Sequence, residues 1–256
     1  MKEQRDILFV SPFLWSSGDK GGLASIYETI QGYIQAGYRA HLLIATNNPH
    51  ELQRGVFDYE GICIHYFQIP INLYEKIYDI YYSVFTIKPK NRLVHAVKRR
   101  LVWLFFVIWG TLTAFRLAQQ IEFKFVYGFT YFGQAVAYFV GRKFNIPNFS
   151  RQLGVVELTP EKTGTLIQKI LRAPQIVGVK LPCAALIIND DGTLIYESIG
   201  ALGIPRERVR VWRNGIDKAL FDNVSYSRSE LRQQLKLPWD KKIVLSTSRL
   251  VAAKRV

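Results

Sequence analysis

The stretch that decides the fold is Asp6-Ile-Leu-Phe-Val-Ser11, followed by Gly18-Asp-Lys-Gly-Gly22. The first part is a run of four strongly apolar residues that ends at Ser-Pro, which is typical of a short buried strand. Residues 23–36 carry apolar side chains at helical spacing and stop at Gly37, and residues 40–46 form a second apolar run. Strand, glycine loop, helix and strand in this order predict a βαβ unit with parallel strands.

The same alternation continues along the chain. Further strands are predicted at residues 62–69, 123–127, 147–153, 184–189 and 209–212. Further helices are predicted at residues 92–120, 131–143, 161–171 and 192–202. We therefore predict an α/β fold, with a Rossmann-like, doubly wound and mostly parallel sheet.

The character of the chain changes near Asn214. Residues 221–228 are polar, residues 229–235 are spaced like a short helix, and residues 242–248 form a fresh apolar strand close to the last residue, Val256. A strand and its exit loop cannot form a core alone. Either this strand joins the first sheet, or a second domain begins with it.

Composition excludes several classes of protein. The 256 residues are 49% hydrophobic and 21% charged, which excludes intrinsic disorder. Two cysteines exclude a disulfide scaffold, and the four histidines have no metal-binding spacing, so we expect no metal site. The N-terminus lacks the long apolar core of a secretory signal, so we expect a protein made in the cytoplasm. The net charge of +14 predicts a polyanionic partner.

Half of that excess lies in one segment. No acidic residue occurs between Asp79 and Glu122, and a basic run leads into nine apolar residues, 101–109. The nine residues fall short of the ~20 that a membrane span needs. Cations beside an aromatic-rich apolar block predict a protein lying on an anionic membrane surface. The residues predicted to contact the membrane are Lys88, Lys90, Arg92, Lys98, Arg99, Arg100, Trp103, Phe105, Phe106 and Trp109.

Two other interpretations of this segment stay open. One is a core helix preceded by a solvated basic loop. The other is nucleic-acid binding, which usually interleaves aromatic side chains with the cations. Here the two kinds of residue form consecutive blocks, so we expect no nucleic-acid partner.

The glycine loop after the first strand matches neither the P-loop spacing nor the dinucleotide fingerprint. It retains Gly21-Gly22 at the start of a helix and at the carboxyl end of a strand. Unpaired backbone N–H groups there favour an anion. A tight turn that needs positive φ explains the same pair without a ligand.

Several stretches together resemble glycosyltransferase family 4, whose members have the two-domain GT-B fold. They are Val10-Ser-Pro12 with Gly21-Gly22, residues 23–41, residues 184–190, residues 202–217 with Phe221, and residues 231–237 with 243–255. The order and spacing of these stretches cover nearly the whole chain. The resemblance implies an N-terminal Rossmann-like, acceptor-side domain at residues 1–215, a hinge at 216–240, and the truncated start of a nucleotide-sugar-binding domain at 241–256.

The resemblance also implies site residues. Arg249 and Lys254 would contact the donor diphosphate, and Gly21 and Gly22 would face the same group across the cleft. Cations at this spacing suit a diphosphate, since Arg forks onto oxygens and Lys acts as a point charge. Two solvated tail cations would explain Arg249 and Lys254 equally simply.

Two further groups belong to the implied cleft. The first is Arg151, Gln152 and Gly154, in a segment where family members often carry a histidine that this chain lacks. The second is Asn214 and Gly215, near the hinge, although Asn-Gly is also a common turn. Arg151 and Gln152 are expected to bind polar groups of the acceptor or donor, and no general base is identified.

The implied activity is retaining transfer of a sugar from a nucleotide-sugar to a glycan or lipid-linked acceptor at the cytoplasmic membrane face. The nucleotide-sugar is a substrate, and no cofactor is expected. The family's paired glutamates fall beyond Val256, so the chain alone is expected to be nearly inactive. The alternative is a non-catalytic anion-binding or membrane-associated interaction module with the same fold.

Overall fold

The computed structural model describes residues 5–12, 24–46, 50, 55–69, 92–189, 194–212 and 227–242, and only the backbone of residues 24, 92–95 and 98. The chain divides into two compact units, residues 1–214 and 215–256. The first unit is built on one eight-stranded sheet. Its strands are β1 (Asp6–Ser11), β2 (Arg39–Thr46), β3 (Val56–Tyr59), β4 (Ile62–Gln68), β5 (Phe123–Phe129), β6 (Asn148–Gln152), β7 (Ala185–Asn189) and β8 (Val209–Trp212).

The spatial order of the strands is β3-β4-β2-β1-β5-β6-β7-β8. All neighbouring pairs are parallel except β3 with β4, which are antiparallel. The chain first adds strands on one side of β1 and then crosses back to add β5 on the other side. This order confirms the predicted doubly wound α/β fold, and its switch point lies between β1 and β5.

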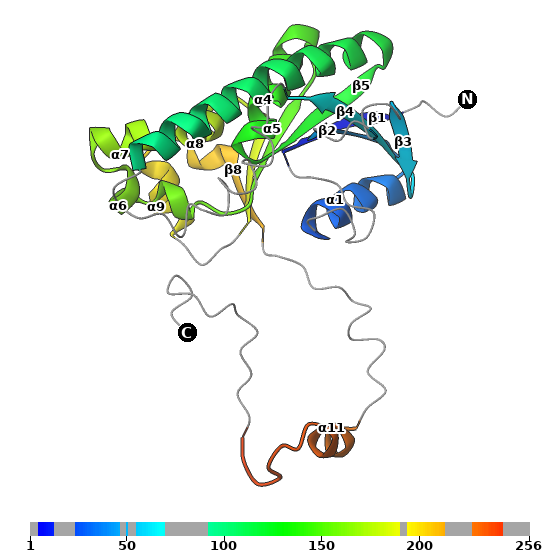
Figure 1. Ribbon diagram of the computed structural model, residues 1–256, viewed down its shortest axis with the longest axis vertical. Helices are drawn as coiled ribbons and strands as arrows, with labels where there is room; N and C mark the ends of the chain where they lie inside the picture. The colour runs from blue at the N-terminus through cyan, green and yellow to red at the C-terminus, as the bar shows by residue number, and fades with distance from the viewer. Residues whose placement is uncertain are drawn as a thin grey trace. The chain divides into compact units, whose positions relative to one another are not determined.

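Helices cover both faces of the sheet (Figure 1). The α1 helix (Ala24–Gln35) lies on one face, and α4 (Arg92–Gln120), α5 (Thr130–Phe144) and α8 (Ala173–Lys180) lie on the other. The fully buried β1 serves both layers, because alternate residues of a strand point to opposite faces. Leu8 and Val10 belong to the cluster under α4 and α5, whereas Ile7 and Phe9 pack with α1.

Most predicted elements of the first unit are present, with three differences. The helix expected at residues 161–171 is broken into α6 (Pro160–Thr163) and α7 (Leu166–Leu171), because Thr165 and Gln168 form a capping box that starts a new helix. Of the helix expected at 192–202, the described residues 194–202 are helical only over α9 (Ile195–Gly200). Strand β3 and helix α8 were not predicted.

The second unit is described only at residues 227–242. It contains α11 (Arg228–Gln234), which confirms the short helix expected there and starts with a capping box between Ser227 and Glu230. The predicted last strand, residues 242–248, lies outside the described residues except for Lys242. Whether it joins the main sheet therefore stays a prediction.

Candidate functional site

The candidate site lies at the carboxyl-terminal edge of the sheet, around the switch point between β1 and β5. Ligands of open α/β sheets bind at this edge, because the strand order reverses there and leaves a crevice. Buried polar side chains collect at the ends of neighbouring strands. They are Ser11 on β1, Thr46 on β2, Arg151 and Gln152 on β6, and Asn189 on β7.

The start of α5 packs unusually close to the two central strands. A Cβ atom on Gly133, in the first turn of α5, would lie less than 3.0 Å from the Val10 carbonyl oxygen of β1. A Cβ atom on Gly128, in β5, would overlap the Gly133 backbone in the same way. Thr130 starts α5 with φ of +59°, a region that non-glycine residues rarely adopt. Two glycines and one strained threonine therefore fix the backbone at the switch point.

Arg151 is the buried cation of this site. Its Nε donates to Asn189 Oδ1 at 2.9 Å, which ties β6 to the end of β7. Its Nη1 donates to the Thr29 hydroxyl and, at 3.4 Å, to the Ser25 carbonyl, both in the first two turns of α1. These are the hydrogen bonds that the guanidinium makes with described residues, and a guanidinium has further N–H groups that can donate to a ligand. The side chain is thus fixed between the end of the sheet and the start of α1.

The surroundings of Arg151 are aromatic. Its guanidinium carbon lies 5.9 Å from the centre of the half-exposed Trp212 ring. Burial raises the pKa of the Tyr127 phenol, and the positive charge of Arg151 opposes that shift. Burial also raises the pKa of Tyr33, and Arg151 again opposes it. Both phenols are therefore neutral and do not compensate the charge of Arg151.

No carboxylate within the described ranges forms an ion pair with Arg151. A buried cation without a carboxylate favours a negatively charged ligand, because ion pairing restores the free energy lost on leaving water. The arrangement can therefore bind and orient an oxyanion at the carboxyl-terminal edge of the sheet.

The other two residues of the predicted segment have different roles. Gln152 is buried, and its amide nitrogen donates to the Ser150 hydroxyl at 2.9 Å within β6. Gly154 has φ of +104° and turns the chain after β6. Only Arg151 of the three joins partners from three separate elements. The remaining predicted cleft residues, Gly21, Gly22, Asn214, Gly215, Arg249 and Lys254, lie outside the described residues.

Sequence reasoning missed the three side chains that contact Arg151, which are those of Asn189, Thr29 and Trp212, and also the Ser25 carbonyl. Asn189 had a usable signal, since a polar residue that ends a buried parallel strand marks the ligand-binding edge. Thr29 had none, because it is 122 residues from Arg151 and is otherwise an ordinary helix residue. Trp212 ends β8 and could have been inferred only once the strand order was known.

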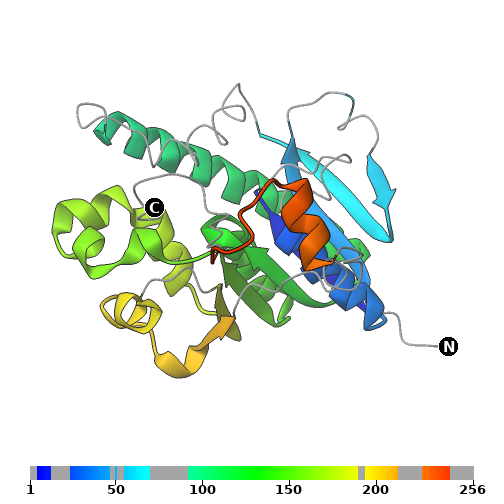
Figure 2. The same cartoon turned by 90° about the horizontal axis from the view of Figure 1, so that it is seen from below.

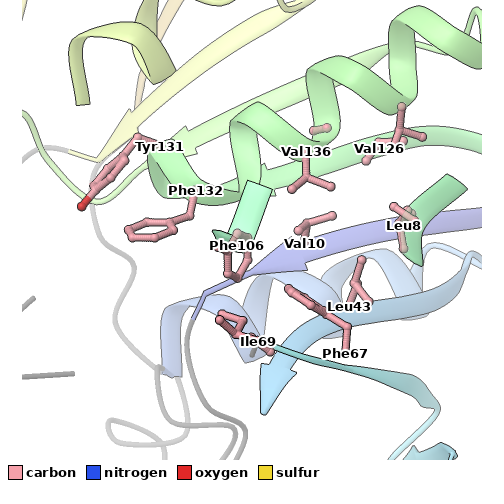
Figure 3. Packing of buried hydrophobic residues seen from close by; sticks show 14 of the residues in the cluster. Leu8, Val10, Leu43, Phe67, Ile69, Phe106, Val126, Tyr131, Phe132 and Val136 are labelled. Carbon is pink, nitrogen blue, oxygen red and sulfur yellow. The ribbon is translucent and has the colours of Figure 1, made fainter. Parts of the chain in front are cut away.

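The structure corrects part of the predicted membrane contact. Phe106 is fully buried and packs edge-on against Phe67 and Phe132, with ring centres 5.2 and 5.3 Å away (Figure 3). Trp103 is half-buried, and its indole N–H donates to the Tyr131 carbonyl at 3.1 Å. Both side chains pack toward the core because α4 packs on the sheet. The prediction of a membrane contact is wrong for the fully buried Phe106, and for the half-buried Trp103 it stays a prediction.

Phe105 and Trp109 are half-buried and pack partly against the same core. Arg99 and Arg100 are also half-buried. The side chains of Arg92 and Lys98, and the whole of Lys88 and Lys90, lie outside the described residues. Residues Arg99–Gln120 are long and apolar enough to cross a membrane by length and composition, with 33% of the window buried. The apolar segment is therefore longer than the nine residues counted in the sequence.

A second polar cluster lies across three strands of the sheet. His41 Nε2 lies 2.7 Å from Asp6 Oδ1, and His41 Nδ1 lies 2.9 Å from His65 Nε2. All three side chains are buried. Burial lowers the pKa of both histidines, and for His65 the charges of His41 and Arg39 add to the effect and bring it to about 4. Among the described residues, no group of three or more His, Cys, Asp and Glu could hold a metal ion.

Solved structures share the fold. Sucrose-phosphate synthase from Thermosynechococcus elongatus aligns over 93% of this chain and 54% of its own, with 13% identity and a TM-score of 0.56. Anabaena Alr3699/HepE in complex with UDP-glucose aligns over 90% of this chain and 50% of its own, with 18% identity and a TM-score of 0.48. This chain thus spans about half the length of either structure. The first likeness shows the α/β fold of one half of a GT-B glycosyltransferase.

Sequence comparison identifies the family. No curated protein matches the chain. A family model described as "Mannosyltransferase (PIG-M)" matches residues 45–197, more than half of the sequence and most of the sheet. The chain therefore belongs to the mannosyltransferase (PIG-M) family, a glycosyltransferase family.

Proposed function

We propose that this chain is the acceptor-side part of a retaining, family 4-like glycosyltransferase. It would help to move a sugar from a nucleotide-sugar to a glycan or lipid-linked acceptor at the cytoplasmic face of the membrane, where the protein is peripherally bound. The family, the fold and the resemblance of residues 202–217 to a family 4 segment support this proposal. The observation that carries it is the buried, fixed Arg151 at the carboxyl-terminal edge of the sheet.

The proposed chemistry needs a cation at this position. Sugar transfer from a nucleotide-sugar breaks the bond between the anomeric carbon and a phosphate oxygen, so negative charge grows on the departing diphosphate. A fixed guanidinium stabilises that charge without reorganising during the reaction. Arg151 would bind a phosphate of the donor or of a lipid-linked acceptor. Gly21, Gly22, Arg249 and Lys254 are proposed to add further contacts to the diphosphate, with Asn214 and Gly215 nearby.

Because the chain belongs to a mannosyltransferase family, mannose is the first sugar to test. The UDP-glucose in the HepE structure makes UDP-glucose a useful second donor. GDP-mannose and UDP-glucose differ in both the nucleotide base and the sugar, so a difference in their binding to the chain would narrow the class of donor.

Replacing Arg151 with Gln should weaken binding of GDP-mannose, UDP-glucose or inorganic pyrophosphate by at least about tenfold. A hydrogen bond to a charged group contributes about 1.5–3 kcal/mol, which corresponds to roughly 10- to 100-fold in affinity. Titration calorimetry on the whole chain measures this loss. The matched control is Arg210→Gln, because Arg210 is an exposed arginine whose hydrogen bonds to described residues go to nearby carbonyls.

Thermal unfolding of both variants separates lost binding from lost folding. The proposal fails if folded Arg151→Gln binds all three ligands as tightly as the original chain. Tight binding without any transfer by a longer form of the protein would instead favour the non-catalytic anion-binding module.

The isolated chain should transfer sugar very poorly or not at all. This expectation rests on the family 4 resemblance, in which the donor-binding domain follows residues 241–256. Release of nucleotide from GDP-mannose in the presence of a lipid-phosphate acceptor measures it. Sustained turnover by the pure chain would contradict the proposed division between acceptor and donor domains.

A further inference from the structure

The outward side of α4 carries a straight line of large apolar side chains. Val97, Leu101, Leu104, Ile108 and Leu112 are between 40% and 51% exposed. Their spacing of three or four residues places them on one narrow face of the helix. That face is opposite the side on which Phe106 enters the core. This line of side chains therefore lies on the surface of a helix whose opposite face packs against the core.

Helix α7 extends this apolar surface. Leu166 and Ile167 are 73% and 71% exposed, and Ile170 is 46% exposed. The Arg100 guanidinium of α4 donates to the Ile170 carbonyl, so α7 lies beside the first half of α4 (Figures 1 and 2). We call these eight residues of α4 and α7 the outer apolar band. Exposed apolar residues gathered in this way mark an interaction surface, unlike singly scattered ones.

The charges around the outer apolar band are mainly positive. Arg116 on α4 and Lys169 on α7 are exposed, and Arg99 and Arg100 are half-buried. The α4 sequence contains no acidic residue. Of the nearby carboxylates, Glu157 pairs with Lys162 and Arg172, and Glu161 is exposed on α6. The band thus combines apolar contact with cations at its margin, which complements an anionic lipid surface.

We propose that the outer apolar band docks the protein on an anionic lipid bilayer, with α4 lying in the interface. This inference rests on the membrane-face location in the proposed function and assigns it a surface. The other side of α4 holds Phe106 and Val102 in the core, which favours a helix lying in the interface over a spanning one. A symmetric contact between two copies would place cations opposite cations, which is unfavourable.

The position of the band gives docking a role. Helix α7 follows the end of β6, and α4 starts after the end of β4, so both reach the carboxyl-terminal edge of the sheet. Arg151 lies at this same edge. The Arg151 side chain points to the α1 face, away from α4. A docked chain therefore keeps the carboxyl-terminal edge of the sheet beside the lipid surface, and a lipid-linked phosphate would reach Arg151 around that edge.

Co-sedimentation of the whole chain with vesicles tests the proposal. The chain should bind phosphatidylcholine vesicles that contain phosphatidylglycerol, and bind pure phosphatidylcholine much more weakly. The double substitution Leu101→Glu and Ile108→Glu should weaken binding to the vesicles by at least about tenfold, because each change replaces an apolar contact with the lipid by a negative charge. Arg116→Glu with Lys169→Glu should weaken binding to the anionic vesicles only.

The control is Val56→Glu with Leu194→Glu, which changes two exposed apolar residues outside the band. The control should bind like the original chain, and circular dichroism should show that every variant is folded. Equal binding by the control and the band variant would overturn the proposal. So would a concentration-dependent dimer, without vesicles, that the band substitutions abolish. Resistance to extraction with alkaline carbonate would indicate a spanning helix instead.

Binding of pyrophosphate separates this inference from the proposed function. The band variants should keep the affinity of the original chain, because their substitutions lie on the outer face of the α4 layer, whereas the Arg151 side chain contacts α1 on the other face of the sheet. Loss of vesicle binding with intact pyrophosphate binding supports the surface. Vesicle binding without any effect of Arg151→Gln on pyrophosphate would keep the docking surface and reject the proposed anion site.

Discussion

Replacing Gly133 with Ala should destabilise the first unit by about 3 kcal/mol or more. The added methyl group would overlap the Val10 carbonyl oxygen and approach the Gly128 backbone. Backbone atoms of two central strands cannot move aside as the end of a flexible side chain can. The whole of α5 would therefore have to shift away from the sheet. Thermal and urea unfolding should show a fall in the midpoint of roughly 10 °C.

Gly32→Ala is the matched control for this prediction. Gly32 is also helical, in α1, and nothing lies within 4 Å of the position of its Cβ atom. Alanine has the higher helix propensity, so this variant should be unchanged or up to about 1 kcal/mol more stable. Equal stability of Gly133→Ala and Gly32→Ala would show that the close approach at the switch point is absent. Ligand binding would be expected to fall with Gly133→Ala, because α5 starts at the same edge as Arg151.

Acidification from pH 6.5 to about pH 4 should cost the protein about 3 kcal/mol of stability through His65 alone. The pKa of His65 is lowered from 6.5 in the unfolded chain to about 4 in the fold. The unfolded chain therefore binds more protons between these values, and stability rises with pH across this window. The contribution is fully present above pH 6.5, and below pH 4 it falls no further. His41 shifts in the same direction.

The hydrogen bonds give an independent reason for this direction. Asp6 accepts from His41 Nε2, so the His41 Nδ1 atom is the acceptor for the N–H at His65 Nε2. If both rings were protonated, two N–H groups would point at each other across 2.9 Å. The network therefore resists protonation of both rings, which lowers the pKa of the pair.

Urea unfolding at a series of pH values measures this effect. The comparison is with His65→Leu, in which the pH dependence between 6.5 and 4 should be clearly flatter. The slope is the readout, because the substitution also changes the absolute stability by removing a partner of His41. An original chain with the same slope as His65→Leu would contradict the assignment.

The sheet was predictable because its strands are short apolar runs separated by helical periods. Strand β3, which was not predicted, also has a recognisable signal in the sequence. Glu60 and Gly61 have φ of +50° and +82°, as a two-residue hairpin turn requires, and the sequence Tyr-Glu-Gly-Ile joins two apolar runs. The break between α6 and α7 was harder to predict, because a capping box inside a helical pattern competes with continuation of the helix.

The error on α4 has a clear physical origin. Residues 101–109 are all apolar, so the sequence contains no periodicity that separates a core face from an outer face. Trp103 and Phe106 were predicted to contact the membrane because large aromatic residues favour membrane interfaces. The aliphatic residues Leu101, Leu104 and Ile108 occupy the exposed side instead. Only the packing of α4 on the sheet distinguishes these two sets.

The candidate site was predictable only in part. Arg151 was identified from the resemblance, and its position near the end of a predicted strand placed it at the carboxyl-terminal edge of the sheet. Its hydrogen bonds to Ser25 and Thr29 span more than 120 residues, and no local pattern encodes them. The charge of a residue can thus be read from sequence, whereas the partners that fix its direction depend on the assembled fold.

The direction of α4 has a further consequence for how substrate would arrive. The helix is 29 residues long, or about 44 Å, and it joins two parallel strands, so it runs alongside them. A chain resting on α4 would hold its strands along the bilayer, and the carboxyl-terminal edge of the sheet would open sideways, parallel to the membrane surface. An acceptor carried by a lipid would then reach this edge by lateral diffusion, and the search would take place in two dimensions instead of three.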